Sequence, residues 1–183
     1  MGLDYTTGCV NFRDVGEFLT LITGEEILPV HRLYRGGSID HVKTHAEISE
    51  VKTVINLRNG EDYHAYEATY LHFPMANKVE KYDTSQKEVR RWLNAIMRTF
   101  EAQDLQYPIL LHCLSGKDRT EIVTAALLMI LGIDEQVIKE EYLLSDGEVQ
   151  LAWIEQAMAG MRNLDRYFDR IDRDLIRRNL LDV

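Results

Sequence analysis

The chain has 183 residues, of which 45% are hydrophobic, and its 3 prolines and 11 glycines exclude a low-complexity polymer. A formal net charge of -9 disfavours nucleic acid and anionic membrane surfaces as partners, because both require a positive field. No secretory signal opens the sequence, and the longest apolar run, around residues 122–133, is too short to cross a bilayer. We therefore expect a cytoplasmic protein that forms one domain over residues 1–183 and does not insert stably into membranes.

Short apolar runs followed by turn residues alternate with amphipathic stretches along the chain. The runs are rich in β-branched residues and predict strands at 27–30, 51–57, 70–74 and 109–112. Apolar residues at helical spacing predict helices at 85–103, 120–131, 134–144 and 149–180. The helix at 120–131 is apolar nearly all round, so we expect it to be buried. The alternation predicts an α/β fold with a mainly parallel central sheet flanked by helices and a helical C-terminal segment.

The two cysteines, Cys9 and Cys113, form no CxxC pair, so a disulfide framework or a thiolate zinc site is not expected. Cys9 is interpreted as a free small residue, and a disulfide that protects the Cys113 thiol is the alternative. His41 and His45 are four residues apart without an evident third ligand, and we interpret them as surface side chains. We expect neither a metal nor another cofactor. Cys113 directly follows His112, which is a pattern to test for a nucleophile.

The segment at 108–120 joins the last predicted strand to the buried helix and has the sequence PILLHCLSGKDRT. Five residues separate Cys113 from Arg119, and Gly116 allows the backbone between them to bend tightly. Such a loop directs backbone N–H groups and the positive end of a helix toward a bound anion. The predicted phosphate-binding residues are Leu114, Ser115, Gly116, Lys117, Asp118 and Arg119.

The residue types in this loop suit the transfer of a phosphoryl group. The positive field of the loop favours a Cys113 thiolate, which attacks phosphorus and forms a phosphocysteine. Arg119 provides a planar fork that binds two phosphate oxygens. We expect His112 to orient the cysteine backbone and Thr120 to donate its hydroxyl to the sulfur.

The leaving oxygen requires a proton, so a general acid is needed. Asp118 lies within the loop, beside Arg119, and Asp83 lies 30 residues before the nucleophile. Either aspartate can serve this role, and we favour Asp118 because it is fixed to the phosphate cradle.

The loop sequence HCLSGKDRT resembles the phosphate-binding loop of the protein tyrosine phosphatase superfamily. The segment NFRDVG at 11–16 resembles the opening motif of a bacterial family of atypical tyrosine phosphatases. Three further segments resemble motifs of that family in the same order, namely LYRGG at 33–37, NLR at 56–58 followed by Glu61, and EYLLS at 141–145.

The resemblance implies an α/β phosphatase fold, metal-free catalysis, and activity on phosphotyrosine or on other phosphoesters, including phosphoinositides. It also supports Asp118 as the acid, and Lys117 is similar to a lysine in loops that handle lipid or polyphosphate substrates. The sequence departs from the family pattern at Glu17, Asn56 and Glu121. Glu121 replaces the glycine that usually follows the loop threonine, and we expect its charge to oppose a highly anionic substrate.

Three arginines outside the loop are candidates for the site. Arg13 and Arg58 either line the mouth of the substrate pocket or brace loops through carboxylates such as Asp14 or Glu61. Arg35 is interpreted as structural.

Three functions are carried forward from these observations. The first is a phosphomonoester hydrolase that acts on phosphotyrosine, with dual or broad specificity as its extension. The second keeps the chemistry but acts on a phosphoinositide or inositol polyphosphate. The third is a non-catalytic phospho-reader. The expected partner in each case is a phosphorylated protein or a small phosphoester.

Overall fold

The structure, a computed structural model, describes residues 8–64 and 66–182. Its centre is a five-stranded sheet with the strand order β1-β2-β5-β3-β4. Strand β1 pairs antiparallel with β2, and all other neighbouring strands are parallel. The expected mainly parallel sheet is therefore confirmed. The strands are β1 (Arg13–Asp14), β2 (Leu33–Gly36), β3 (Thr53–Asn56), β4 (Thr69–His72) and β5 (Ile109–His112).

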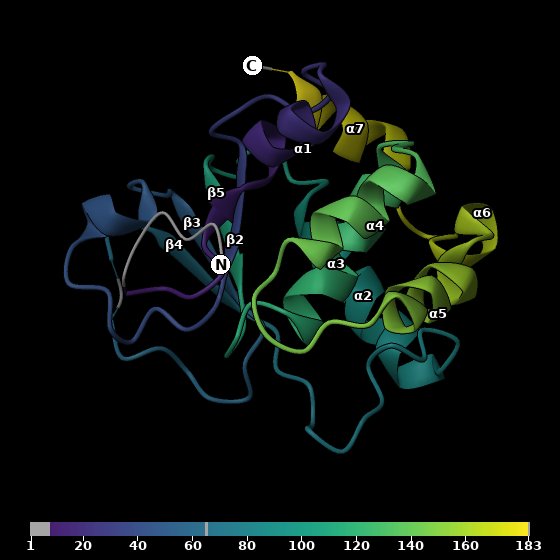
Figure 1. Cartoon of the computed structure of the whole chain (residues 1–183), viewed down its shortest axis with the longest axis horizontal. Coiled ribbons are helices and arrows are strands. Elements are labelled where there is room, and N and C mark those ends of the chain that lie inside the picture. The colour runs from purple at the N-terminus through teal and green to yellow at the C-terminus, as the bar shows by residue number, and fades with distance from the viewer. Residues whose placement is uncertain (1–7, 65, 183) are drawn as a thin grey trace.

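Helices cover one face of this sheet, and a largely irregular segment covers the other. In Figure 1, α2 to α6 gather on one side of the strands, while α1 and α7 are at the end of the view where the C-terminus is marked. The helices are α1 (Val15–Thr23), the 3-10 helix η1 (His45–Ile48), α2 (Lys87–Thr99), α3 (Asp118–Ile130), α4 (Glu135–Leu143), α5 (Leu151–Met161), α6 (Leu164–Tyr167) and α7 (Arg173–Leu181).

Three of the expected strands, at 51–57, 70–74 and 109–112, correspond to β3, β4 and β5. The expected strand at 27–30 is wrong, because these residues form bends and a turn. Pro29 has no backbone N–H to donate to a sheet ladder. The strand in this part of the chain is β2 instead.

The 149–180 stretch, which the sequence predicts to be helical, is divided into α5, α6 and α7. The side chain of Asn163 accepts a hydrogen bond from the N–H of Arg166 at 3.0 Å, where α6 begins. The side chain of Asp172 accepts one from the N–H of Leu175 at 2.9 Å, where α7 begins. Each cap satisfies an N–H group that a helix start leaves unpaired, so each one favours a new helix.

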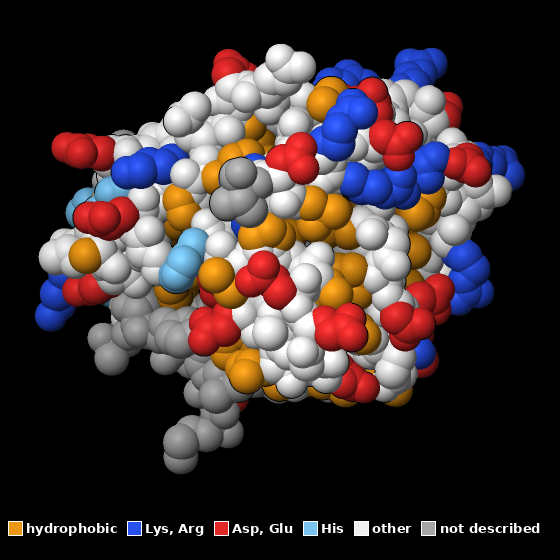
Figure 2. Space-filling view, turned by 90° about the horizontal axis from the view of Figure 1, so that it is seen from above, with side chains coloured by type: hydrophobic (Ala, Val, Ile, Leu, Met, Phe, Trp, Pro, Cys, Tyr) orange, Lys and Arg blue, Asp and Glu red, His pale blue; other side chains and the backbone are white. Residues whose placement is uncertain are grey.

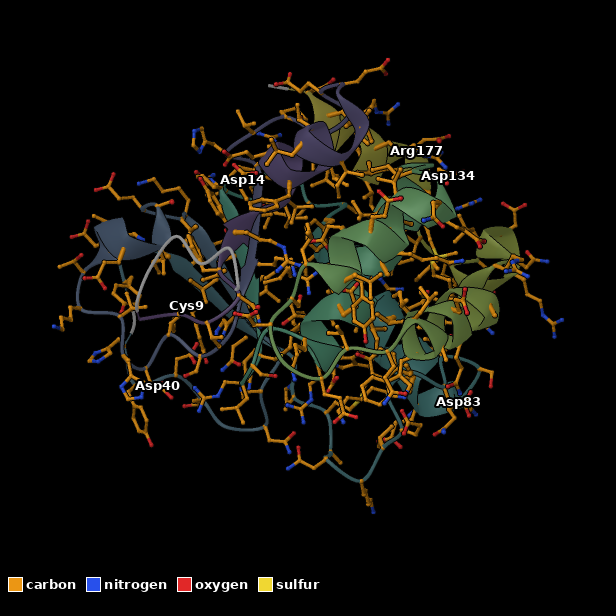
Figure 3. The ribbon with its side chains drawn as sticks, viewed as in Figure 1. Cys9, Asp14, Asp40, Asp83, Asp134 and Arg177 are labelled. Atoms are coloured by element: carbon orange, nitrogen blue, oxygen red, sulfur yellow. The ribbon has the colours of Figure 1, made fainter. Side chains whose placement is uncertain are left out.

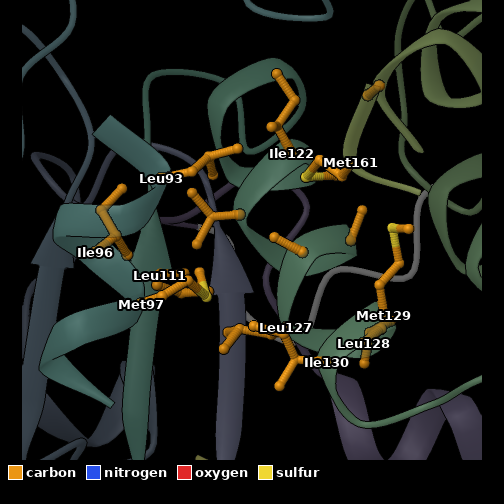
Figure 4. Packing of buried hydrophobic residues seen from close by; sticks show 14 of the residues in the cluster. Leu93, Ile96, Met97, Leu111, Ile122, Leu127, Leu128, Met129, Ile130 and Met161 are labelled. Atoms are coloured by element: carbon orange, nitrogen blue, oxygen red, sulfur yellow. The ribbon is translucent and has the colours of Figure 1, made fainter. Parts of the chain in front are cut away.

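The main hydrophobic core lies between the sheet and the helical layer. Figure 4 shows Leu93, Ile96 and Met97 of α2 near Leu111 of β5, with Leu127 of α3 beside them. All residues of α3 from 119 to 130 are buried, as expected from its apolar sequence. The burial of α3 fixes its first turn, which directly follows the predicted phosphate loop.

A second, smaller core lies on the other face of the sheet. It contains Tyr34 and Val54 from the strands and Ile39, Val42 and Ile48 from the irregular segment that includes η1. This packing holds the segment that follows β2 against the sheet.

The surface carries charges of both signs. Figure 2 shows acidic and basic side chains on the same face, with apolar atoms between them. Among the described residues, no helix is both long and apolar enough to cross a bilayer.

Candidate active site

The loop 113–117 connects the carboxyl end of β5 to α3 and lies against the end of β2. The N–H of Cys113 donates to the carbonyl of Gly36 at 3.4 Å, and the N–H of Ser38 donates to the carbonyl of Leu114 at 2.9 Å. Gly116 has φ of 67°, and a Cβ there would lie 2.6 Å from the carbonyl carbon of Gly36. Only glycine fits this close approach without strain.

A pocket of about 260 Å³ opens over this loop. Two residues of its wall come from the segment between β4 and α2, and the others come from the loop and the first turn of α3. The lining residues are Asn77, Lys81, Cys113, Leu114, Ser115, Asp118 and Arg119. Most of the predicted loop residues are therefore brought together around Cys113, which is 4% exposed.

Arg119 lies at the wall of the pocket, in the first turn of α3. Its guanidinium donates a hydrogen bond to the side chain of Asn77. Its Nε is buried and has no hydrogen-bond partner among the described residues, and the same holds for Oγ1 of Thr120. Buried polar groups of native proteins rarely lack a partner. Both groups are therefore available to a bound ligand or to the Cys113 sulfur.

The two candidate acids lie in different surroundings. Asp118 lines the pocket, and its Oδ1 accepts a hydrogen bond from the hydroxyl of Tyr82 at 2.9 Å. Burial raises the pKa of Tyr82, and its contacts with Tyr142 and Asp118 raise it further, so Tyr82 remains a donor at neutral pH. Asp83 does not line the pocket. Hydrogen bonds from Ser85 and Gln86 lower its pKa.

His112 is buried at the end of β5. Its Nε2 lies 2.8 Å from Oδ2 of Asp62, and its Nδ1 lies 3.4 Å from the carbonyl oxygen of Cys113. Asp62 also accepts from Arg58 at 3.3 Å, and Arg58 donates to Asp40 at 2.8 Å. The structure thus places Arg58 in a brace of the loops beside His112, outside the pocket lining. Its carboxylate partners are these two aspartates rather than Glu61, and it also donates to the hydroxyl of Ser38 at 3.2 Å.

Four buried charges lie beneath the loop and join four elements. Arg35 donates to Glu121 at 2.6 Å, to Glu141 at 2.5 Å and to the carbonyl of Gly116 at 3.0 Å. Arg13 donates to Glu141 at 2.7 Å and does not line the pocket. None of the four side chains is more than 2% exposed. We call Arg13, Arg35, Glu121 and Glu141 the buried quartet.

The quartet shifts the pKa values of its two glutamates in opposite directions. Burial raises the pKa of Glu121, although Arg35 opposes this. Burial would also raise the pKa of Glu141, but its two arginine partners outweigh that effect and lower it. Glu121 is fully buried beneath the loop and does not line the pocket, so it has no direct contact with a substrate there. The interpretation of Arg35 as structural agrees with its complete burial.

Three further predicted or open positions are placed away from the pocket. Lys117 directs its Nζ to the carbonyl of Glu148 at 3.5 Å and does not line the pocket. Cys9 is a buried cysteine whose thiol donates to the carbonyl of Gly37 at 3.3 Å. Figure 3 shows Cys9 on the sheet side of the molecule and Asp83 on the side of the helices.

Sequence reasoning missed several residues that the fold brings to the site. Asn77, Asp62 and Tyr82 contact Arg119, His112 and Asp118, respectively. No local motif marks these three residues, since each lies in an irregular segment. Asn11 belongs to the NFRD motif, and its amide donates to the carbonyl of Ser115 at 2.9 Å.

Solved structures with low sequence identity share this fold. The catalytic core of Siw14 is 15% identical, with a TM-score of 0.57, over 94% of this chain and 91% of that one. A mouse putative dual-specificity phosphatase, crystallised with zinc tungstate, is 17% identical, with a TM-score of 0.52, over 73% of this chain and 84% of that one. The fold is therefore that of the protein-tyrosine-phosphatase-like proteins.

The sequence model described as "Tyrosine phosphatase family" matches residues 5–182, and the chain belongs to that family. That family consists of phosphatases of the protein tyrosine phosphatase type. The triple specificity protein phosphatase PtpB of Mycobacterium tuberculosis is 48% identical over 42 residues. That match covers 23% of this chain and only 15% of the length of the curated relative.

Proposed function

We propose that residues 1–183 form one phosphatase domain that hydrolyses phosphotyrosine through a phosphocysteine at Cys113. The observation that carries this proposal is the pocket in which Cys113, Asp118 and Arg119 share one wall. A nucleophile, an acid and a cation that binds phosphate oxygens are the groups that this chemistry requires.

In the first step, the Cys113 thiolate attacks phosphorus and forms an S–P bond while the ester P–O bond breaks. Arg119 binds two phosphoryl oxygens, and its unpaired Nε is one of the donors. The backbone of residues 114–118 supplies further N–H donors at the start of α3. Asp118 transfers its proton to the leaving oxygen, so the alcohol or phenol departs neutral.

In the second step, water attacks phosphorus, and the S–P bond breaks. Asp118, now ionised, accepts a proton from that water, and inorganic phosphate leaves. The sulfur departs as a thiolate, and the Thr120 hydroxyl, which is buried without another partner among the described residues, donates to it. His112 keeps the backbone of Cys113 in place through the carbonyl of that residue.

Asp118 is the general acid in this proposal, because it lines the pocket and Asp83 does not. The lowered pKa of Asp83, caused by hydrogen bonds from Ser85 and Gln86, favours an ionised carboxylate that holds no proton at neutral pH.

The aryl substrate is supported by Leu114, which lines the pocket and is 66% exposed. Its side chain offers an apolar surface to a phenyl ring beside the phosphate cradle. The phosphoinositide alternative depends on Lys117, whose ammonium group instead contacts the carbonyl of Glu148. Glu121 is fully buried and accepts a hydrogen bond from Arg35, so its carboxyl group does not contact the substrate.

The test compares initial rates of wild type, Cys113→Ser and Asp118→Asn on para-nitrophenyl phosphate, on a phosphotyrosine peptide and on inositol phosphates. EDTA is present throughout, so that a contaminating metal phosphatase does not contribute. We expect Cys113→Ser to abolish turnover and Asp118→Asn to lower it about a hundredfold on the peptide. We expect the wild type to have its highest kcat/KM on the peptide.

Unchanged turnover in Cys113→Ser would contradict the cysteine mechanism. A higher kcat/KM on inositol phosphates would replace phosphotyrosine with the second substrate class. Tight peptide binding by the wild type without product on any substrate would identify a phospho-reader. Equal losses in Asp83→Asn and Asp118→Asn would remove the acid assignment.

A further inference from the structure

A groove of about 460 Å³ runs along the exposed side of α2, separate from the residues that line the catalytic pocket. Five of its side chains are basic and one is acidic, although the chain as a whole has a net charge of -9. The basic residues are Lys87, Arg90, Arg91, Arg98 and Arg170, and the acidic residue is Asp169. We call this feature the α2 groove.

The helix itself arranges most of these charges. Lys87, Arg91 and Arg98 are separated by four and seven residues, so they share one face of α2. The rise of an α-helix spreads this row over about 16 Å. The opposite face of α2 is buried in the core. The row therefore cannot turn away from solvent without unfolding the helix.

Most of the groove's cations lack a partner. Among the described residues, the side chains of Lys87, Arg91, Arg98 and Arg170 form no hydrogen bond or ion pair. Asp169 is already paired with Arg90 at 3.2 Å. Like charges three or four residues apart on a helix repel each other and destabilise it. The basic row thus has an energetic cost, which a bound anion would remove.

The shape of the row selects among anions. Its cations are spread along a line, whereas a single phosphate group is bound best by donors that converge on it. In an extended peptide, side chains on the same face are about 6.6 Å apart, close to the rise of about 6 Å between Lys87 and Arg91. A guanidinium binds a carboxylate through two parallel hydrogen bonds.

The surroundings of the groove argue against two other polyanions. Its lining includes none of the large exposed hydrophobic side chains, which would anchor it to a membrane interface. It also has no aromatic side chain on which a nucleic acid base would stack.

We propose that the α2 groove binds an acidic, extended segment of a partner polypeptide. The segment carries Asp or Glu at alternate positions, and these pair with the basic row of α2. Lys87 follows Lys81 of the catalytic pocket by six residues, so their Cα atoms are at most about 22 Å apart. A partner in the groove therefore lies close to the active site.

The probe is a fluorescein-labelled peptide of alternating Glu and Ser, about a dozen residues long, with no phosphate. Fluorescence polarisation at low ionic strength measures its Kd for the whole chain. The groove variant is Arg91→Glu with Arg98→Glu, and the matched control is Lys43→Glu with Lys52→Glu, which changes the net charge equally outside the groove. Because the peptide has no phosphate, the result does not depend on the proposed catalytic activity.

We expect the groove variant to weaken binding about tenfold or more, and the control by less than about threefold. Added salt should weaken wild-type binding by screening. A further variant, Arg91→Ala with Arg98→Ala, removes the charges without adding acids near the end of α2, and should also weaken binding. Circular dichroism checks that each variant is folded.

If the groove and control variants lose peptide affinity equally, or if the wild type does not bind the peptide, the proposal is overturned. Competition identifies the partner class. A single-stranded oligonucleotide or vesicles of phosphatidylserine and phosphatidylcholine that displace the peptide at lower anion concentration would replace the acidic peptide as partner. If neither competitor displaces the peptide at a lower anion concentration, the result supports the proposal.

Discussion

At the scale of single residues, the hydroxyl of Tyr82 orients the proposed acid. It donates to Asp118 at 2.9 Å and lies 3.4 Å from the hydroxyl of Tyr142. These contacts fix the position of one carboxylate oxygen of Asp118. Because both oxygens belong to one planar group, the position of the second oxygen is restricted as well. A carboxyl group that must protonate a leaving oxygen depends on such placement.

We predict that Tyr82→Phe lowers kcat for phenyl phosphate about tenfold but for para-nitrophenyl phosphate less than about twofold. The nitrophenolate is a good leaving group that needs little help from an acid, whereas phenolate needs the proton. Steady-state rates on both esters check this. Tyr142→Phe changes a residue that is one contact further from Asp118, so kcat for both esters should stay close to the wild-type value. An equal fall on both esters would show that Tyr82 does not act through the acid.

At the scale of elements, catalysis depends on how the loop between β5 and α3 lies against β2. Gly116 contacts the backbone of Gly36 so closely that a Cβ would come within 2.6 Å of its carbonyl carbon. The carbonyl of Gly116 also accepts a hydrogen bond from Arg35 of β2 at 3.0 Å. The strand thus determines where the loop's N–H groups point.

We predict that Gly116→Ala lowers kcat/KM at least about a hundredfold, because one misplaced set of oxyanion donors has a cost of that size. The residue has φ of 67°, so alanine adds about 1–2 kcal/mol of strain besides the clash. Thermal unfolding should show a Tm lower by several degrees. Gly60→Ala is the control, because nothing lies within 4 Å of its Cβ position. Similar kinetics in the two variants would contradict this account of the loop.

At the scale of the whole molecule, the buried quartet joins β1, β2, α3 and α4. Arg13 and Glu141 are 128 residues apart in sequence, and Arg35 and Glu121 are 86 apart. Removing one partner of a buried ion pair leaves the other charge buried and uncompensated, which strongly destabilises the folded state. The quartet therefore makes the sheet and the helical layer depend on each other.

The quartet also predicts a pH dependence of stability. Burial raises the pKa of Glu121, so the folded chain keeps this proton at pH values where the unfolded chain has released it. The stability contributed by Glu121 therefore falls as the pH rises above the ordinary range of a glutamate. Glu141 has a lowered pKa, and its contribution is lost only at lower pH, in wild type and variant alike.

We predict that the Tm of Glu121→Gln minus the Tm of wild type increases by roughly 3–6 °C when the pH is raised from about 5 to about 8. Glutamine keeps an oxygen that accepts from Arg35 but does not ionise. Thermal unfolding across this pH range measures the difference. The control is Glu26→Gln at an exposed glutamate, whose difference from wild type should stay constant. Parallel curves for Glu121→Gln and wild type would contradict the prediction.

The sequence by itself determined the features whose signals are contiguous. Strand β5, the loop from Cys113 to Arg119 and the buried helix α3 follow one another directly, so apolar runs, the glycine and the residue spacing marked them without knowledge of the fold. The alternation of strand-like and helix-like segments indicated the fold class, and the family motifs agreed with it. The same local reasoning failed at 27–30, where Pro29 removes a donor from an apolar run that otherwise resembles a strand.

Only the tertiary structure decided the partners of the charged side chains. The contact between His112 and Asp62 spans 50 residues of sequence, and that between Tyr82 and Asp118 spans 36. A buried charge is stabilised by whichever opposite charge the packed elements bring to it, and no local pattern encodes that choice. For this reason Arg13 and Arg58 were open candidates for the substrate pocket in the sequence, whereas in the fold Arg13 pairs with a buried glutamate and Arg58 pairs with a partly buried aspartate.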